Sequence, residues 1–387
     1  MNRFIIFLVS FFIFPGYYAG LSLFYLFQKQ DLSRFYTVPL RVLLMLVMAY
    51  FIIKSPARKG IRIITSLVIT FSIFYSIKIF YTEIDAYKYV PLSKPWYEYL
   101  FYFVSFNVLP FFFYSSVDIK RYGKLILDSV IFSGFVFGVV VIAMYKDVLL
   151  SGGIGRISNL YYVSGDETIS PLALSYSGAL VAALIFYQFI FQKKKFWSLL
   201  FSIITLLLSL TLIFMGASRG AIVAVIFSLI LILMFTQGKN KIYLITSIAL
   251  LTPVVIYIME LTGSELFGRV TDTIDSGDTS GRETLWNDAL QEFYSYPFLG
   301  GQIEVSGIYP HNIFLELLMA TGVVGFLMFF IILVKSLFNG VKISKQNSVY
   351  LIALIILANG IAQYLFSGSI WQGLLLFAPM GMLNKKE

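Results

Sequence analysis

The single histidine of the chain stands in a setting suited to proton transfer. His311 lies between Pro310 and Asn312, at the predicted start of a long apolar helix, and Pro310 suits the first helical turn. A helix begins with unpaired amides and a partial positive charge, which favours the neutral imidazole that can accept a proton. We therefore interpret His311 as a candidate general base; a purely structural histidine is the alternative interpretation.

Two arginines stand in settings suited to a phosphate group. Arg219 lies in a Gly-Ala-Ser-Arg-Gly segment that interrupts an apolar stretch, and Ser218 is expected to cap the helix that follows. A planar guanidinium beside a helix N-terminus matches phosphate oxygens. Arg282 opens a second predicted helix, where Ser280 and Glu283 have the spacing of a capping box. Contact with lipid headgroups is the alternative for both arginines.

The helix that opens with Arg282 is predicted to be amphipathic and to end before Pro297. Arg282 and Trp286 are four residues apart, so they share one face. Trp286 is suited to stack on a sugar ring while Arg282 binds a phosphate. An amphipathic helix of this kind is expected to lie on the outer membrane interface, and a simple interfacial anchor is the alternative interpretation.

Two glycines follow His311 along its predicted helix. At about 100° per residue, His311, Gly322 and Gly325 fall on one stripe of that helix. We expect the glycines to allow close approach of a neighbouring helix below the histidine.

The composition excludes several other kinds of site. The chain has no cysteine and one histidine, which excludes thiolate nucleophiles, disulfides and metal sites with several histidines. Asp272, Asp275 and Asp278 are spaced by three residues, but a solvated acidic loop explains them better than a divalent ion does. We predict neither a bound metal nor a cofactor.

The elements that position these residues are predicted to be membrane helices. Of the 387 residues, 59% are apolar and only 13% are charged, and the mean hydropathy is +0.84. This composition excludes a soluble enzyme. The predicted fold is all-α: one polytopic membrane domain over 1–387, with about 12 transmembrane helices of ~20 residues each. Their ranges are 4–27, 38–53, 63–80, 96–114, 125–144, 172–191, 197–215, 221–235, 242–259, 311–334, 349–366 and 369–383.

Charge predicts the orientation of these helices. Most of the 29 Lys and Arg residues fall in alternate short connections, which the positive-inside rule places in the cytoplasm together with both termini. The net charge of +9 is therefore a topology signal, and we predict no nucleic-acid partner. Two connections on the outer side are long, 145–171 and 260–310. The second contains Arg269 and Arg282 and is expected to hold short amphipathic helices and active-site elements.

Taken in order, these segments resemble the O-antigen ligase and polymerase superfamily of bacterial surface polysaccharide synthesis. The similarity covers about Leu212 to Phe330, and its last element is His-Asn followed after nine residues by Gly-x-x-Gly. The matching segments are Gly216–Ala221, Ser280–Trp286, Pro297–Gly300, His311–Asn312 and Gly322–Gly325. Arg156 and Asn159, in the first long connection, are looser equivalents.

The resemblance implies a metal-independent glycosyltransferase that uses an undecaprenyl-pyrophosphate-linked oligosaccharide. It implies a multi-pass protein of the bacterial inner membrane, among membrane lipids, with its active site on the periplasmic face and a chain-length regulator protein as a candidate partner. His311, Arg282 and Arg219 would be the catalytic residues. Trp286, Asn312, Arg156 and Arg269 would bind substrate.

On these grounds we expect a repeat-unit polymerase, which transfers a lipid-linked glycan onto the terminal sugar of another lipid-linked unit. A ligase that transfers the glycan to lipid A-core is the closest alternative. One polymerase pattern, in which glycine follows an arginine after ten intervening residues, is absent after Arg156, Arg219, Arg269 and Arg282. An alternative from another class is a lipid-linked oligosaccharide flippase, which would need charged residues lining a path through the spans, and Glu316 is the clearest buried acid in a span.

Overall fold

The protein is described by a computed structural model. The described residues are 3–55, 63–84, 92–153, 155–160, 169–193, 195–276 and 281–384, so Asp278 and Ser280 lie outside them. Within these ranges all the regular structure is helical apart from one isolated β-bridge between Val305 and Ile308. The predicted all-α fold class is therefore confirmed.

Fewer helices can span a membrane than the sequence predicts. Among the described residues, eight helices are long and apolar enough to do so, or nine if a pair bent by 56° near the N-terminus forms one span. Several predicted spans correspond to helices that are too short to cross a membrane or that are divided into segments. Two, Arg219–Phe235 and Leu374–Leu383, have fewer than 18 residues, and a third is divided into segments between Trp96 and Ser116. The predicted count of about 12 is not confirmed.

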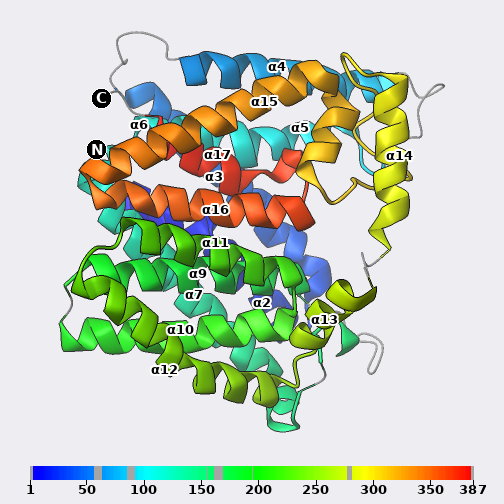
Figure 1. Ribbon diagram of the computed structural model, residues 1–387. Helices are drawn as coiled ribbons and strands as arrows, with labels where there is room; N and C mark the ends of the chain where they lie inside the picture. The colour runs from blue at the N-terminus through cyan, green and yellow to red at the C-terminus, as the bar shows by residue number, and fades with distance from the viewer. Residues whose placement is uncertain are drawn as a thin grey trace. The chain divides into compact units, whose positions relative to one another are not determined.

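The chain divides into two compact units, each described here by itself. Unit 1 comprises Met1–Val47, Ile119–Ser276 and Asn347–Asn359. Its long helices α9, α10 and α12 run side by side (Figure 1). Its elements are α1 (Arg3–Ile13), α2 (Gly16–Leu26), η1 (Gln30–Leu32), the first part of α3 (Ser33–Lys54), α7 (Ile119–Leu150), α9 (Pro171–Phe191), α10 (Phe196–Gly216), α11 (Arg219–Phe235), α12 (Lys239–Thr262), α13 (Leu266–Ser276), η3 (Ser348–Tyr350) and the start of α16 (Leu351–Phe366).

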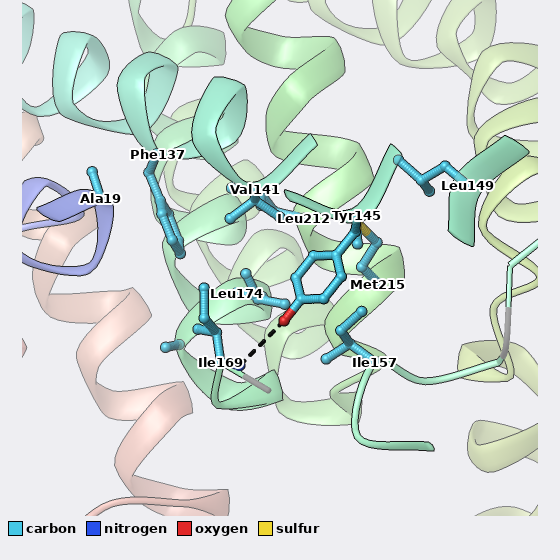
Figure 2. Packing of buried hydrophobic residues seen from close by; sticks show 11 residues of the cluster. Ala19, Phe137, Val141, Tyr145, Leu149, Ile157, Ile169, Leu174, Leu212 and Met215 are labelled. Carbon is cyan, nitrogen blue, oxygen red and sulfur yellow. Dashed lines mark hydrogen bonds between the residues drawn. The ribbon is translucent and has the colours of Figure 1, made fainter. Parts of the chain in front are cut away.

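A hydrophobic cluster packs the ends of α7, α9 and α10 together in unit 1 (Figure 2). Tyr145, at a kink in α7, lies in this cluster, and its hydroxyl accepts a hydrogen bond from the backbone amide of Ile169 at 3.3 Å. Ile157 and Met215 also belong to it; Ile157 directly follows Arg156, and Met215 lies four residues before Arg219. Burying a large apolar side chain stabilises a fold by about 1.5–3 kcal/mol. The cluster therefore stabilises the ends of α7, α9 and α10 and the segment that contains Ile157.

Unit 2 comprises Met48–Asp118, Gly277–Gln346 and Gly360–Glu387. In this unit α14 packs on α15 and runs across its end, whereas α4 lies along α15 (Figure 1). Besides the ends of α3 and α16, its elements are α4 (Ile63–Ile84), α5 (Trp96–Phe103), the π-helical η2 (Val104–Val108), α6 (Leu109–Ser116), α14 (Arg282–Ser295), α15 (Ile313–Gln346), η4 (Ile370–Gln372) and α17 (Leu374–Leu383).

A break at Gly322 divides α15. Gly322 has φ 60° and ψ −166°, a conformation that is essentially restricted to glycine. The break releases the amides of Val323 and Val324 from the helix, and these donate to the carbonyls of Pro297 at 2.8 Å and Phe298 at 3.2 Å. Gly301 in turn donates its amide to the carbonyl of Met319 at 2.8 Å. The Pro-Phe-Leu-Gly segment thus supplies the hydrogen bonds that the broken helix lacks.

This break corrects the prediction of one glycine stripe below His311. Rotation by 100° per residue does not continue through Gly322, and His311 itself lies before the helix begins. Close approach does occur at Gly325, where an added Cβ would lie 2.9 Å from the ring of Phe74 in α4.

We predict that Gly322→Ala destabilises the protein. An added Cβ would lie 2.4 Å from the carbonyl of Phe298, and the backbone strain alone costs about 1–3 kcal/mol. The midpoint of thermal unfolding in detergent should fall by several degrees. Gly268→Ala in α13 is the matched control, because nothing lies within 4 Å of a Cβ there. Equal midpoints for the two variants would contradict the assigned role of the break.

Candidate active site

The turn between α10 and α11 is the centre of the site in unit 1. Ala217 ends α10 in the left-handed region, with φ 44°, and its amide donates to the carbonyl of Ile213 at 3.0 Å. Ser218 occupies the N-cap position of α11, but its side chain makes no capping bond, contrary to the prediction. Its amide instead donates to the hydroxyl of Ser175 in α9 at 3.2 Å. Backbone strain of this kind persists only where surrounding contacts enforce it.

Three predicted site arginines gather around that turn. Arg156 donates from Nε to the carbonyl of Gly216 at 3.1 Å, and Arg269 donates from Nη1 to the carbonyl of Ala217 at 2.7 Å. Arg219 donates from Nη1 to the carbonyl of Arg269 at 3.2 Å. All three side chains are half-buried. A guanidinium carries a positive charge and has five donors in a planar fork, so a cluster of three is suited to an anion.

The segment that carries Arg156 is fixed from both sides. The amide of Ile157 donates to the carbonyl of Met215 at 2.9 Å, and its side chain belongs to the buried cluster of Figure 2. The amide of Glu265 donates to the carbonyl of Gly155 at 3.2 Å, just before α13. Three regions distant in sequence are thereby held together: the connection after α7, the turn after α10 and the start of α13.

The site in unit 2 is built at the start of α15. The structure begins this helix at Ile313, two residues after His311, so Pro310 and His311 precede it. Asn312 caps the helix, because its Oδ1 accepts hydrogen bonds from the amides of Phe314 at 3.0 Å and Leu315 at 3.2 Å. This structural role was not predicted for Asn312. His311 has φ 57°, which is uncommon for a residue other than glycine.

Aromatic side chains hold the segment before α15. The indole Nε1 of Trp286 donates to the carbonyl of Pro310 at 2.9 Å, which connects α14 to the backbone beside His311. The ring of Tyr309 lies 4.5 Å from the imidazole ring, measured between centroids. Trp286 is therefore a structural contact of the histidine segment, and its predicted stacking on a sugar stays a prediction.

The surroundings of His311 favour the neutral form of its imidazole. Burial lowers the pKa of His311 below its ordinary value, and the positive charge of Arg282 lowers this pKa further. The helix N-terminus, on which the sequence prediction relied, is not the principal cause. The buried Nδ1 atom has no hydrogen-bond partner among the described residues. A neutral imidazole beside a cation is suited to accept a proton.

The helix that carries Arg282 turns its apolar face to the protein. Arg282 is the first residue of α14, with Gly281 at the N-cap position and no side-chain capping bond there. Ser280, on which the predicted capping box depends, lies outside the described residues. Ala289 packs against Val305 and Met319. The expected contact of this helix with the membrane interface stays a prediction.

Several supporting residues carried no recognised signal in the sequence. Lys78, only 7% exposed, donates from Nζ to the carbonyl of Gly300 at 2.8 Å. Glu304, 4% exposed, accepts hydrogen bonds from the amide and hydroxyl of Ser93. Charged residues within apolar surroundings are the signal that would have singled them out. The seven predicted site residues thus form two groups. Arg156, Arg219 and Arg269 gather in unit 1, and Arg282, Trp286, His311 and Asn312 gather in unit 2.

Comparison with known proteins identifies the family of this region. No curated protein matches the chain. Residues 204–330, about a third of the chain, match the family model described as O-antigen ligase. This range contains Arg219, Arg282 and His311, together with the break at Gly322. The family implies a glycosyltransferase-like ligase or polymerase activity on lipid-linked oligosaccharides. The match supports the O-antigen ligase and polymerase superfamily, so the resemblance seen in the sequence is confirmed over residues 204–330.

Proposed function

We propose that the protein is a polysaccharide repeat-unit polymerase of the bacterial inner membrane, active at the periplasmic face. It transfers the glycan of an undecaprenyl-pyrophosphate-linked donor onto the terminal sugar of another lipid-linked unit. The observation that carries the proposal is the placement of the half-buried His311 near the charge of Arg282, which lowers the pKa of the imidazole, within the region that matches the family.

The reaction is a displacement at the anomeric carbon of the donor. A hydroxyl oxygen of the acceptor sugar forms the new bond to that carbon. The bond from carbon to the pyrophosphate oxygen breaks, and the leaving group keeps its electron pair. Negative charge therefore develops on the pyrophosphate, and fixed cations stabilise it without reorganisation. Arg219 and Arg282 are assigned this role, with Arg156 and Arg269 as further substrate-binding residues in unit 1.

His311 accepts the proton of the attacking hydroxyl. A general base must be deprotonated at the working pH and lie close to that proton. The lowered pKa of His311 meets the first condition. The cap at Asn312 and the bond from Trp286 to Pro310 fix its backbone, which supports the second. These residues need no metal ion for either task, and the proposed mechanism is metal-independent.

We predict that His311→Ala and Arg282→Ala each reduce a polymer ladder to single repeats. The experiment expresses each variant in a host without its own copy and separates the polysaccharide by gel electrophoresis. Membrane fractions probed with an epitope tag establish that each variant is present in amounts like those of the wild type. Lys335→Ala, in the second half of α15 and 24 residues after His311, is the control and should leave the ladder intact. Wild-type ladders from both site variants would refute the site assignment.

We predict that Arg282→Gln raises the pKa of His311. The Arg282 charge opposes protonation of the imidazole, so its removal makes protonation easier, while burial keeps the pKa below its ordinary value. Because the chain has one histidine, an NMR titration of isotope-labelled histidine reports this group alone when the purification tag lacks histidine. Lys335→Gln serves as the charge-matched control. A pKa that falls or does not move in Arg282→Gln would contradict the assigned electrostatics.

A ligase is the second candidate, because the matching family model is described as O-antigen ligase. The two activities leave different products when the gene is deleted in its own host. Loss of a polymerase leaves lipid A-core that carries one repeat. Loss of a ligase leaves bare core and full-length glycan on its lipid carrier. We predict the first pattern in a gel of the lipopolysaccharide, and the second would replace the polymerase proposal with the ligase.

A further inference from the structure

A buried carboxylate in α15 fixes a distant turn of unit 2. Glu316 lies five residues after His311 and is 0% exposed. Its carboxylate accepts hydrogen bonds from the hydroxyl of Ser369 and from the amide of Ile370, the latter at 3.2 and 3.1 Å to its two oxygens. An ionisable group in an apolar span is costly, so its presence there calls for a specific role.

The same turn is held by two further side chains. Asn107 donates from Nδ2 to the carbonyl of Ile370, and the hydroxyl of Tyr364 donates to the carbonyl of Gln372. The peptide groups on both sides of Ile370 are therefore bonded to side chains, Glu316 on the amide and Asn107 on the carbonyl. Asn107 lies in the π-helical segment η2, a kind of irregularity that is frequent at functional sites.

Trp371, in this fixed turn, extends an aromatic stack to the histidine. It is 5% exposed, and its ring lies 5.2 Å from that of Tyr99 and 5.4 Å from that of Tyr102. On another side its ring meets that of Tyr309 at 6.3 Å and 85°. The ring of Tyr309 then lies 4.5 Å from the imidazole of His311 at 62°. Edge-to-face pairs at such distances are attractive and directional.

We propose that Glu316 and Trp371 are positioning residues for His311, which act through Tyr309. Glu316 sets the turn at Ile370, this turn sets the ring of Trp371, and Trp371 fixes the face of Tyr309 that packs against the imidazole. The inference rests on the proposed function for its catalytic consequence, but the positioning itself is a structural claim with its own measurement.

The backbone of His311 explains why such support is needed. A residue other than glycine with φ 57° is strained, and the strain persists only where surrounding contacts determine the conformation. Asn312 and Trp286 fix the backbone on either side of the histidine. Neither contact fixes the ring, and Tyr309 does. A catalytic group displaced by about 1 Å can lose about 100-fold in rate.

The first test reads the position of the imidazole without any activity. Protein labelled at its single histidine gives one set of imidazole NMR signals. In Glu316→Leu and Trp371→Leu these signals should shift or broaden. In the conservative variants, Glu316→Gln keeps an oxygen acceptor and Trp371→Phe keeps an aromatic ring, so the signals should stay near those of the wild type. Asn339→Leu is the matched control, because it removes a bond from α15 to the carbonyl of Leu383 in the same unit.

The second test separates positioning from folding. With purified lipid-linked substrates, the two leucine variants should lower kcat by about 100-fold and change KM by less than about threefold, whereas Asn339→Leu should change neither. If the leucine variants fail to reach the membrane, Tyr309→Leu takes their place, since Tyr309 is half-buried and makes the final contact.

Unchanged imidazole signals in the leucine variants, or an equal change in Asn339→Leu, would overturn the positioning role. Shifted signals with full activity would overturn its catalytic consequence together with the proposed role of His311 as the base. Shifted signals, rescue by the conservative variants and a lower kcat would support the whole inference.

Discussion

The structure depends on one constraint, the need of every backbone amide and carbonyl in an apolar environment for a hydrogen-bond partner. A continuous helix meets this need by itself, and a broken one does not. In unit 2 the break at Gly322 frees two amides, and the carbonyls of Pro297 and Phe298 accept them. In unit 1 the turn after α10 exposes the carbonyls of Gly216 and Ala217, and arginines donate to both. Each interruption therefore recruits another segment of the chain.

This constraint explains why arginines of unit 1 lie at the C-terminal end of α10. A carbonyl at a helix C-terminus carries a partial negative charge and attracts a cation. Arg156 and Arg269 meet that demand at the end of α10. A carbonyl is uncharged, so these two hydrogen bonds do not themselves cancel the positive charge of the arginines. A planar guanidinium also matches phosphate oxygens, so the side chains that complete the turn are suited to the diphosphate of the proposed donor.

The sequence was sufficient for the residue types of the site but not for their geometry. Arginine in an apolar stretch and a lone histidine before a long helix are visible in any reading, and periodicity gives the all-α class. The wrong prediction of a glycine stripe below His311 has one cause. Helical rotation was continued through Gly322 and back to His311, although both residues have positive φ. A break of this kind is set by contacts with residues distant in sequence, here Pro297 and Phe298, and no local pattern contains them.

The partners of the buried ionisable residues were also not predictable from local sequence. Lys78 and Gly300 are 222 positions apart, and Glu316 and Ile370 are 54 apart, so only the fold joins them. A charged residue in an apolar helix is visible in the sequence, but its partner is not. From the sequence alone, Glu316 is therefore also compatible with a transport path, which would need charged residues that face a polar passage.

The partners of the buried charges oppose that interpretation. Of the residues that the structure describes, those with an ionisable acidic or basic group and a buried side chain are Lys78, Glu304 and Glu316, tyrosines aside. Each bonds to the backbone of another segment: Lys78 to the carbonyl of Gly300, Glu304 to the amide of Ser93 and Glu316 to the amide of Ile370. A passing ion or headgroup would have to break these bonds. Groups that are fixed in this way give rigidity to the segments around a reacting centre, which a transferase requires and a moving carrier does not.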